Sequence, residues 1–208
     1  MTQIDSLPVT KVKVAPKRAH AIKQAVRTAE NMATDNHISR LATPDDAALF
    51  FRFLSDPAVS APIYTLPTQL SEASVREFIE SFCAGRETGT ELLFLNFNEA
   101  GQLGGYTDVT VWPDYAAGEL GGAVHPNRQG QRRGIAGAEM GFTWMFDTLD
   151  LDTICETAAL DNVRTARLLD TLGFRRVGQT VSKYDDGRSR DSLVWEVTKD
   201  EWMALTKN

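Results

Sequence analysis

Arginine and glycine are concentrated in one short segment of the chain, residues 125–136 (HPNRQGQRRGIA). Its arginines, Arg128, Arg132 and Arg133, stand out because the whole chain has a net charge of −6. A strand pattern precedes the segment, and an amphipathic helix pattern follows it. A helix N-terminus attracts anions through its unpaired N–H groups and its dipole, and glycine lets a ligand approach the main chain. The segment therefore predicts a phosphate or pyrophosphate site.

Glu119 is the best candidate for acid–base chemistry. It lies on a predicted strand, residues 119–125, that leads directly into the basic segment. A carboxylate in a cleft can take a proton from an ammonium group if burial raises its pKa. The alternative is an exposed strand carboxylate or an ion-pair partner, and the sequence alone leaves both roles open.

The elements that must position these residues alternate along the chain. Apolar periodicity and turn residues predict strands at residues 38–41, 91–98, 104–112, 119–125, 153–157, 175–183 and 192–197. Helices are predicted after Thr43, around 75–82, over 135–149 and 162–172, and after Thr198. This order predicts an α/β fold, a three-layer α/β sandwich around a mixed, mostly antiparallel sheet.

The first 37 residues differ from the remainder, residues 38–208. They are rich in lysine and arginine and poor in acids, and four apolar residues fall on one helical stripe: Ile22, Val26, Ala29 and Met32. Two interpretations remain open, a partly ordered extension or a helix that packs on the domain edge or on a partner subunit. We treat residues 1–37 as an N-terminal extension, which is helical under the second interpretation, and residues 38–208 as the main domain.

Composition excludes several other classes of protein. A chain of 208 residues that is 42% hydrophobic and 24% charged is typical of one soluble domain. The acidic balance argues against a nucleic-acid partner, and no apolar run reaches the ~18 residues of a membrane span. We therefore predict a cytoplasmic protein without a membrane or nucleic-acid partner. The three histidines, His20, His37 and His125, are scattered, so no metal site is predicted.

From Ile38 to Leu205 the chain resembles the GNAT acetyltransferase superfamily, and within it the Rim-type N-acetyltransferases. Residues 131–136 (QRRGIA) match the family's acetyl-CoA motif. Arg128 competes with Gln131 for the first motif position, and Gln131 places the later small residues correctly. Residues 161–174 (DNVRTARLLDTLGF) are similar to a second family signature, and residues 186–202 are similar to the Rim-type ending.

The resemblance implies a GNAT-like fold and acetyl-CoA as co-substrate. The pyrophosphate would be held at the start of the helix by Gln131, Arg132, Arg133, Gly134, Ile135 and Ala136. The strand over residues 119–125 would separate from the next strand to admit the pantetheine arm, whose amides would bond main-chain groups near Ala123 and Val124. Asn162 would bind the same arm, with Thr165 nearby, although Asn162 also suits a helix cap.

The resemblance also bears on catalysis. It implies Glu119 as the base, since the family often has a catalytic glutamate at a similar point. Many members carry a tyrosine as general acid before the Leu-Gly-Phe signature, but Leu169 stands there in this chain. Tyr184 then becomes a candidate proton donor to the leaving thiolate, with edge packing as its other role.

We therefore predict an N-acetyltransferase that acts on a primary amine, either a protein N-terminus or a small molecule, by direct attack in a ternary complex. The two early helices and residues 60–70 are expected to bind the amine. A non-catalytic acyl-CoA-binding module and a transferase for a longer acyl group such as succinyl are the alternatives. The family and the extension also suggest a homodimer.

Overall fold

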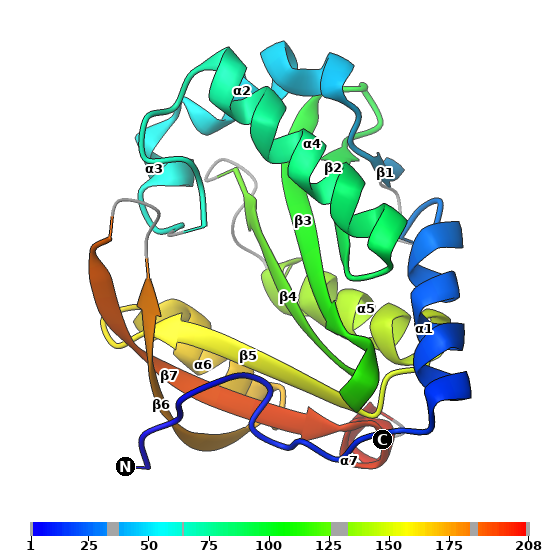
Figure 1. Ribbon diagram of the computed structural model, residues 1–208. Coiled ribbons are helices and arrows are strands. Elements are labelled where there is room, and N and C mark those ends of the chain that lie inside the picture. Colours follow the sequence, from blue (N-terminus) through cyan, green and yellow to red (C-terminus); the bar gives the residue numbers. More distant parts are fainter. Residues whose placement is uncertain (1, 33–37, 64, 126–132, 184–186, 207–208) are drawn as a thin grey trace.

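The computed structural model describes residues 2–32, 38–63, 65–125, 133–183 and 187–206 (Figure 1). Its centre is a seven-stranded sheet in the order β1-β2-β3-β4-β5-β7-β6. The strands are β1 Ile38–Leu41, β2 Glu91–Phe97, β3 Leu103–Trp112, β4 Ala117–Val124, β5 Thr153–Ala159, β6 Arg175–Lys183 and β7 Ser189–Thr198. Only β4 and β5 are parallel, and all other neighbouring pairs are antiparallel. The predicted mixed, mostly antiparallel sheet of an α/β fold is confirmed.

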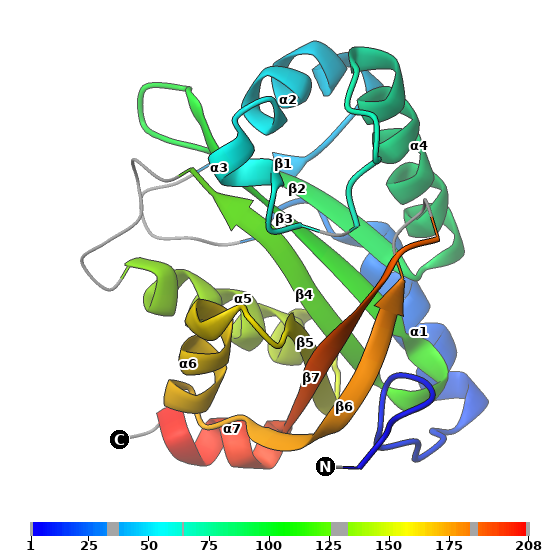
Figure 2. The same cartoon turned by 90° about the vertical axis from the view of Figure 1, so that its left-hand side faces the viewer.

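Helices cover both faces of this sheet (Figure 2). One face is covered by α2 Ala47–Leu54 and α4 Glu72–Thr88, with the short α3 Pro57–Ser60 beside them. The other face is covered by α5 Arg133–Thr148 and α6 Val163–Thr171, and α7 Lys199–Thr206 closes that side. Short 3-10 turns lie at Pro44–Asp46 and Pro113–Tyr115.

Local residue types explain where the helices begin and end. Ser71 caps α4 by accepting a hydrogen bond from the Ser74 N–H, at 3.1 Å. The helix extends beyond the predicted residues 75–82 and stops at Gly89, which has φ 81°. Gly173, with φ 80°, ends α6 in the same left-handed conformation, as its position in the sequence indicates.

The N-terminal segment is built into the main core. A helix, α1 Pro16–Thr28, carries the predicted apolar stripe, and Ile22 and Val26 are fully buried with Leu92 of β2 in the largest core cluster. Before α1, the chain crosses the far end of the sheet. There the Ile4 N–H donates to the Gln179 carbonyl, at 2.7 Å. Of the two interpretations of this segment, the helix packed on the domain agrees with these contacts.

Across the described ranges, no helix is both long enough and apolar enough to cross a membrane.

Candidate active site

The parallel strands β4 and β5 separate soon after they meet. They pair only at Ala117 with Thr153 and at Gly118 with Ile154, although β4 continues to Val124 and β5 to Ala159 (Figure 1). The sheet therefore opens along most of the length of these two strands. The family resemblance led us to expect such an opening, with the pantetheine arm between the strands.

Hydrogen-bond alternation decides which main-chain groups of β4 face the opening. At one end of the β3–β4 ladder the His125 N–H donates to the Gly104 carbonyl, at 3.0 Å. At the other end the Leu120 N–H points away from β3 and donates to Glu156 Oε1, at 2.8 Å. In an antiparallel ladder successive residues alternate in this way. The main chain of Val124 therefore faces the opening, whereas that of Ala123 belongs to the ladder with Tyr106.

The start of α5 lies outside the sheet, beyond the end of β4. Gly134 and Ala136 are exposed in its first turns, and Ile135 is partly buried. A Cβ added at Gly134 would have only one neighbour within 4 Å, Arg164 of α6, with its Nη2 at 3.9 Å. A basic side chain thus lies beside the exposed helix start. Gln131 and Arg132, together with the side chain of Arg133, lie outside the described residues.

Asn162 is the N-cap of α6. Its Oδ1 accepts a hydrogen bond from the Thr165 N–H, at 3.1 Å. The capping role considered for Asn162 is therefore present, and contact with a cofactor stays a prediction for both residues. Leu169 is buried in the core, where it has no group to donate a proton. Tyr184, the other candidate donor, lies outside the described residues.

Glu119 is partly buried and projects from β4 on the side of the sheet that α2 and α4 cover. Its Oε1 accepts a hydrogen bond from Thr157 Oγ1 of β5, at 2.7 Å, so the side chain bridges the two separating strands. Burial raises the pKa of Glu119, while the Thr157 hydrogen bonds and the charge of Arg190 act in the opposite direction. The exposed-carboxylate alternative therefore does not describe this site.

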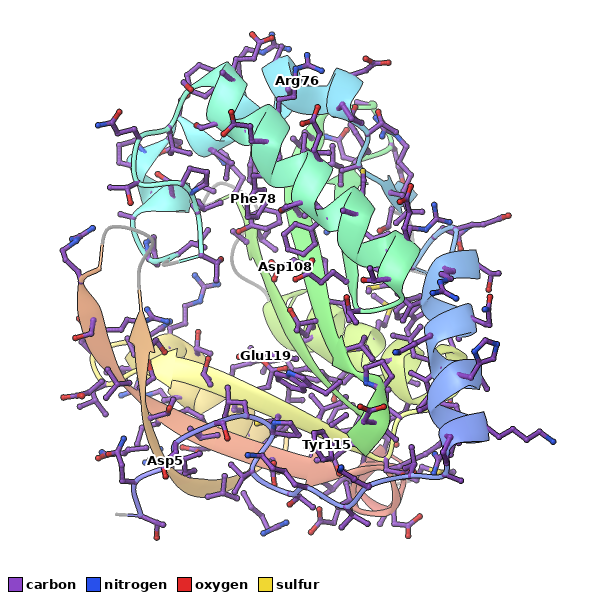
Figure 3. All side chains as sticks on the ribbon, in the orientation of Figure 1. Asp5, Arg76, Phe78, Asp108, Tyr115 and Glu119 are labelled. Atoms are coloured by element: carbon purple, nitrogen blue, oxygen red, sulfur yellow. The ribbon has the colours of Figure 1, made fainter. Side chains whose placement is uncertain are left out.

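Asp108 is a second carboxylate on the same side of the sheet, and the sequence patterns did not single it out. It is paired with Gly121 across the β3–β4 ladder, and Thr110, two residues along β3, is paired with Glu119. In Figure 3 Asp108 and Glu119 lie one below the other between α4 and β5. Burial, then repulsion from Glu119 and Glu91, raises the pKa of Asp108 to about 7. An acid inside an alternating strand was the only signal in the sequence.

Glu156 completes the group of carboxylates from inside β5. Its side chain is only 5% exposed and accepts the hydrogen bond from the Leu120 N–H of β4. Burial, followed by repulsion from Glu119, raises the pKa of Glu156 well above its ordinary value. Where the sheet opens, the Glu156 carboxylate therefore takes the place of the β5 main chain as the hydrogen-bond partner of β4.

Aromatic side chains line the sheet beyond the carboxylates. Phe50 and Tyr106 pack edge to face with ring centroids 5.0 Å apart, and Phe78 and Phe82 of α4 form a similar pair at 5.0 Å. The Tyr106 hydroxyl is buried and has no hydrogen-bond partner within the described part of the chain. Burial, then the nearby Asp108, raises the pKa of Tyr106 well above its ordinary value.

A contact between His125 and Asp56 connects this aromatic layer to the end of β4. His125 Nε2 lies 3.3 Å from Asp56 Oδ2, which is in the turn between α2 and α3, and the His125 ring packs against Phe53 with centroids 6.1 Å apart. These contacts give His125 a structural role at the end of β4. Among the described residues, no group of three or more His, Cys, Asp or Glu is arranged to hold a metal ion.

Solved acetyltransferase structures have a similar fold. The RimJ protein of Mycobacterium smegmatis, solved in complex with CoA-disulfide, is 23% identical with a TM-score of 0.67, and the match covers 79% of this chain and 83% of that one. A ribosomal-protein-S5-alanine acetyltransferase from Vibrio fischeri is 16% identical with a TM-score of 0.67, over 82% and 97% of the two chains. A spermidine N-acetyltransferase from Vibrio cholerae, solved with CoA and spermine, is also 16% identical with a TM-score of 0.67, over 82% and 99%.

Sequence comparison gives a family match but no individual curated relative. No curated protein matches the chain. The family model for the acetyltransferase (GNAT) domain matches residues 38–175, which hold the opened strands, the basic helix start and the carboxylates described above. Because this match covers well over half of the chain, the protein belongs to the GNAT acetyltransferase family.

Proposed function

We propose that this protein transfers an acetyl group from acetyl-CoA to a primary amine by direct attack in a ternary complex. The observation that carries the proposal is the opening between β4 and β5 with carboxylates of raised pKa at its edge. Acetyl transfer needs both a bound cofactor arm and a proton acceptor, and this arrangement supports the assignment of both to this region.

The described residues suit a bound acetyl-CoA, whose contribution to the chemistry is an activated thioester. The exposed start of α5 offers main-chain N–H groups and a helix dipole to the pyrophosphate, and Arg164 adds a positive charge beside it. We assign this role to residues 131–136, as the sequence motif indicates. We assign contacts with the pantetheine amides to the main chain of Val124 and the side chain of Asn162, as the family resemblance implies.

The carboxylates supply the acid–base chemistry. An ammonium ion must lose a proton before its nitrogen can attack a thioester carbon. Glu119, held by Thr157 at the edge of the opening, attracts the ammonium, and a carboxylate at this site takes the proton. The nitrogen then forms the new C–N bond, the C–S bond breaks, and the electron pair of that bond leaves with the coenzyme A sulfur.

The acceptor is a primary amine from a protein N-terminus or from a small molecule. The names of two structural relatives refer to the alanine of a ribosomal protein and to spermidine. Spermidine carries primary amines, and an alanine of a protein carries one when it is the N-terminal residue. In this chain the aromatic layer of α2 and α4 lies beside the carboxylates, so we place the group that carries the amine there.

Release of coenzyme A from acetyl-CoA, measured with a panel of amines and short peptides, tests the function. We expect amine-dependent release, and we expect Glu119→Gln to lower kcat/KM by about 10²–10⁴. The matched control is Glu91→Gln on the same side of the sheet, which should stay within a few-fold of wild type. Tight coenzyme A binding in calorimetry without any turnover would instead identify a non-catalytic module, and faster release from succinyl-CoA would identify a longer acyl donor.

A further inference from the structure

Asp108 leans across β4 toward the opening between β4 and β5. It belongs to β3, but a Cβ added at Gly121 of β4 would collide with both carboxylate oxygens of Asp108. Gly121 lies three residues beyond Gly118, the last β4 residue that pairs with β5. The absence of a side chain at Gly121 therefore gives the Asp108 carboxylate access to the part of the sheet where the strands have separated.

Asp108 and Glu119 are neighbours with different surroundings. They are diagonal partners on adjacent strands, and for this arrangement Cα atoms lie about 7–8 Å apart. Glu119 accepts a hydrogen bond from Thr157 and has the positive charge of Arg190 nearby. No side chain in the described part of the chain donates a hydrogen bond to Asp108, and the charges that act on it, Glu119 and Glu91, are negative.

The carboxylates around Asp108 on the neighbouring strands all disfavour its ionised form. Glu91 of β2 and Glu119 of β4 repel its charge, and Glu156 of β5 is also close enough for mutual repulsion. Tyr106 of β3 presents a buried hydroxyl that stays neutral. Among the described residues, the cation that acts on the pair is Arg190 of β7, and it acts on Glu119. When two close carboxylates have unequal partners, the proton stays on the one with fewer stabilising contacts.

We propose that Asp108 is the proton acceptor of the acetyl transfer and that Glu119 is the fixed anion that binds the acceptor ammonium. The inference rests on the proposed function and divides its acid–base chemistry between two residues. In the first step the ammonium N–H bond breaks and its proton goes to ionised Asp108, which leaves a neutral amine held beside Glu119. The amine nitrogen then bonds to the thioester carbon as the C–S bond breaks, the second nitrogen proton passes to the departing sulfur, and Asp108 returns its proton to solvent.

The pH dependence of kcat/KM separates the two roles, since it reports ionisation in the free enzyme. We expect the wild-type rate to rise with pH through a step near 7, the pKa to which burial and its acidic neighbours raise Asp108. Asp108→Asn should remove this step and lower kcat by about 10²-fold or more. Glu119→Gln should instead raise the KM for the amine more than it lowers kcat, and it should move the step to lower pH because a repelling charge is gone.

Gly121→Ala tests the same assignment without changing either carboxylate. An alanine methyl group would displace the Asp108 side chain, so this variant should reproduce the loss of kcat seen in Asp108→Asn. The double variant that combines Gly121→Ala with Asp108→Asn should be no slower than Asp108→Asn alone, because the effects of two substitutions that disrupt the same contact are not additive. Glu91→Gln is the matched control, with kcat retained and the step moved slightly to lower pH. Thermal melts of every variant test whether each is folded.

The outcomes distinguish the inference from the proposed function. An active wild type whose Asp108→Asn variant keeps full kcat and the same pH step would overturn the inference and leave acetyl transfer intact. A wild type that releases no coenzyme A with any amine would overturn the proposed function itself. If Asp108→Asn does not fold, the shift of the step in Glu119→Gln decides the question: a shift to lower pH supports Asp108, and the complete loss of the step assigns it to Glu119.

Discussion

The acid–base properties of single residues in this protein depend on which neighbours the strands bring to them. Asp108 and Glu119 are both partly buried carboxylates on one side of the sheet, and their residue types alone would give them similar pKa values. Thr157 and Arg190 favour the ionised form of Glu119, whereas Asp108 is surrounded by acids. The difference between a fixed anion and a proton acceptor therefore comes from contacts across strands.

Asp108 should make the folded protein less stable as the pH rises. Because its folded-state pKa of about 7 lies above the ordinary value of 3.8, its contribution to stability is complete below about pH 4 and is lost as the pH rises through 7. Asp108→Asn should therefore raise Tm at pH 8, by about 2–4 °C for each kcal/mol by which the free energy of unfolding increases. At pH 4 its effect on Tm should be much smaller. Thermal melts at both pH values measure this.

Glu77→Gln, on the exposed side of α4, is the control for the change of a carboxylate to an amide. It should alter Tm by a similar small amount at both pH values. An equal shift of Tm at pH 4 and pH 8 in Asp108→Asn would contradict a raised pKa at this position.

At the scale of elements, the start of α6 combines a structural role with a predicted binding role. Asn162→Ala removes the hydrogen bond to the Thr165 N–H and should lower the free energy of unfolding by about 1 kcal/mol. Asn162→Ser retains an oxygen that can cap the helix but shortens the side chain. If the Asn162 amide also binds the pantetheine arm, the serine variant should keep most of its stability and bind coenzyme A more weakly in calorimetry. Equal affinity in wild type and Asn162→Ser would restrict this residue to capping.

Helix α1 should contribute to stability as a core element. Ile22 is only 1% exposed, so Ile22→Ala should lower the free energy of unfolding by about 2–5 kcal/mol in urea titrations. Val12 precedes the same helix and is 71% exposed, so Val12→Ala should change stability by less than about 0.5 kcal/mol. A similar small effect for both variants would mean that α1 is not part of the folded core in solution.

At the scale of the whole molecule, the N-terminal segment covers an edge of the sheet. Strand β6 is the last in the sheet order, and residues 2–4 bond it through the main chain at Gln179. Farther along, the Val9 and Thr10 N–H groups donate to Glu196 Oε1, at 2.8 and 2.9 Å. These contacts fasten the segment along the end of the molecule, where an unpaired strand edge favours association between chains.

Deletion of residues 1–10 should therefore promote association of the protein. We expect the truncated chain to show a larger and more concentration-dependent mass than the full chain in light scattering, because the edge of β6 becomes available for strand pairing. Gln3→Ala is the matched control, since its main-chain bonds remain. The homodimer that the sequence suggested is a separate prediction, which the mass of the full chain tests. An unchanged mass after the deletion would show that residues 2–4 do not protect this edge.

The sequence by itself determined the strands of this protein, most of its helices and the helix start where a pyrophosphate is expected to bind. Apolar periodicity, proline and glycine positions and capping residues act within a few neighbours along the chain, so they can be recognised without tertiary contacts. The helix predicted after Thr198 is an example, because the Thr198 N–H donates to Glu201 Oε2, at 2.8 Å, at the start of α7. The family motif at residues 131–136 is equally local.

Only the tertiary structure decided the register of the strands, and with it the chemistry of the opening. Asp108, Glu119 and Glu156 lie on three different strands, and no spacing along the chain indicates that they share one environment. The role of Gly121 in making room for Asp108 follows only from the pairing of β3 with β4. A pKa depends on burial and on charges that lie nearby in space, and both arise when the sheet assembles.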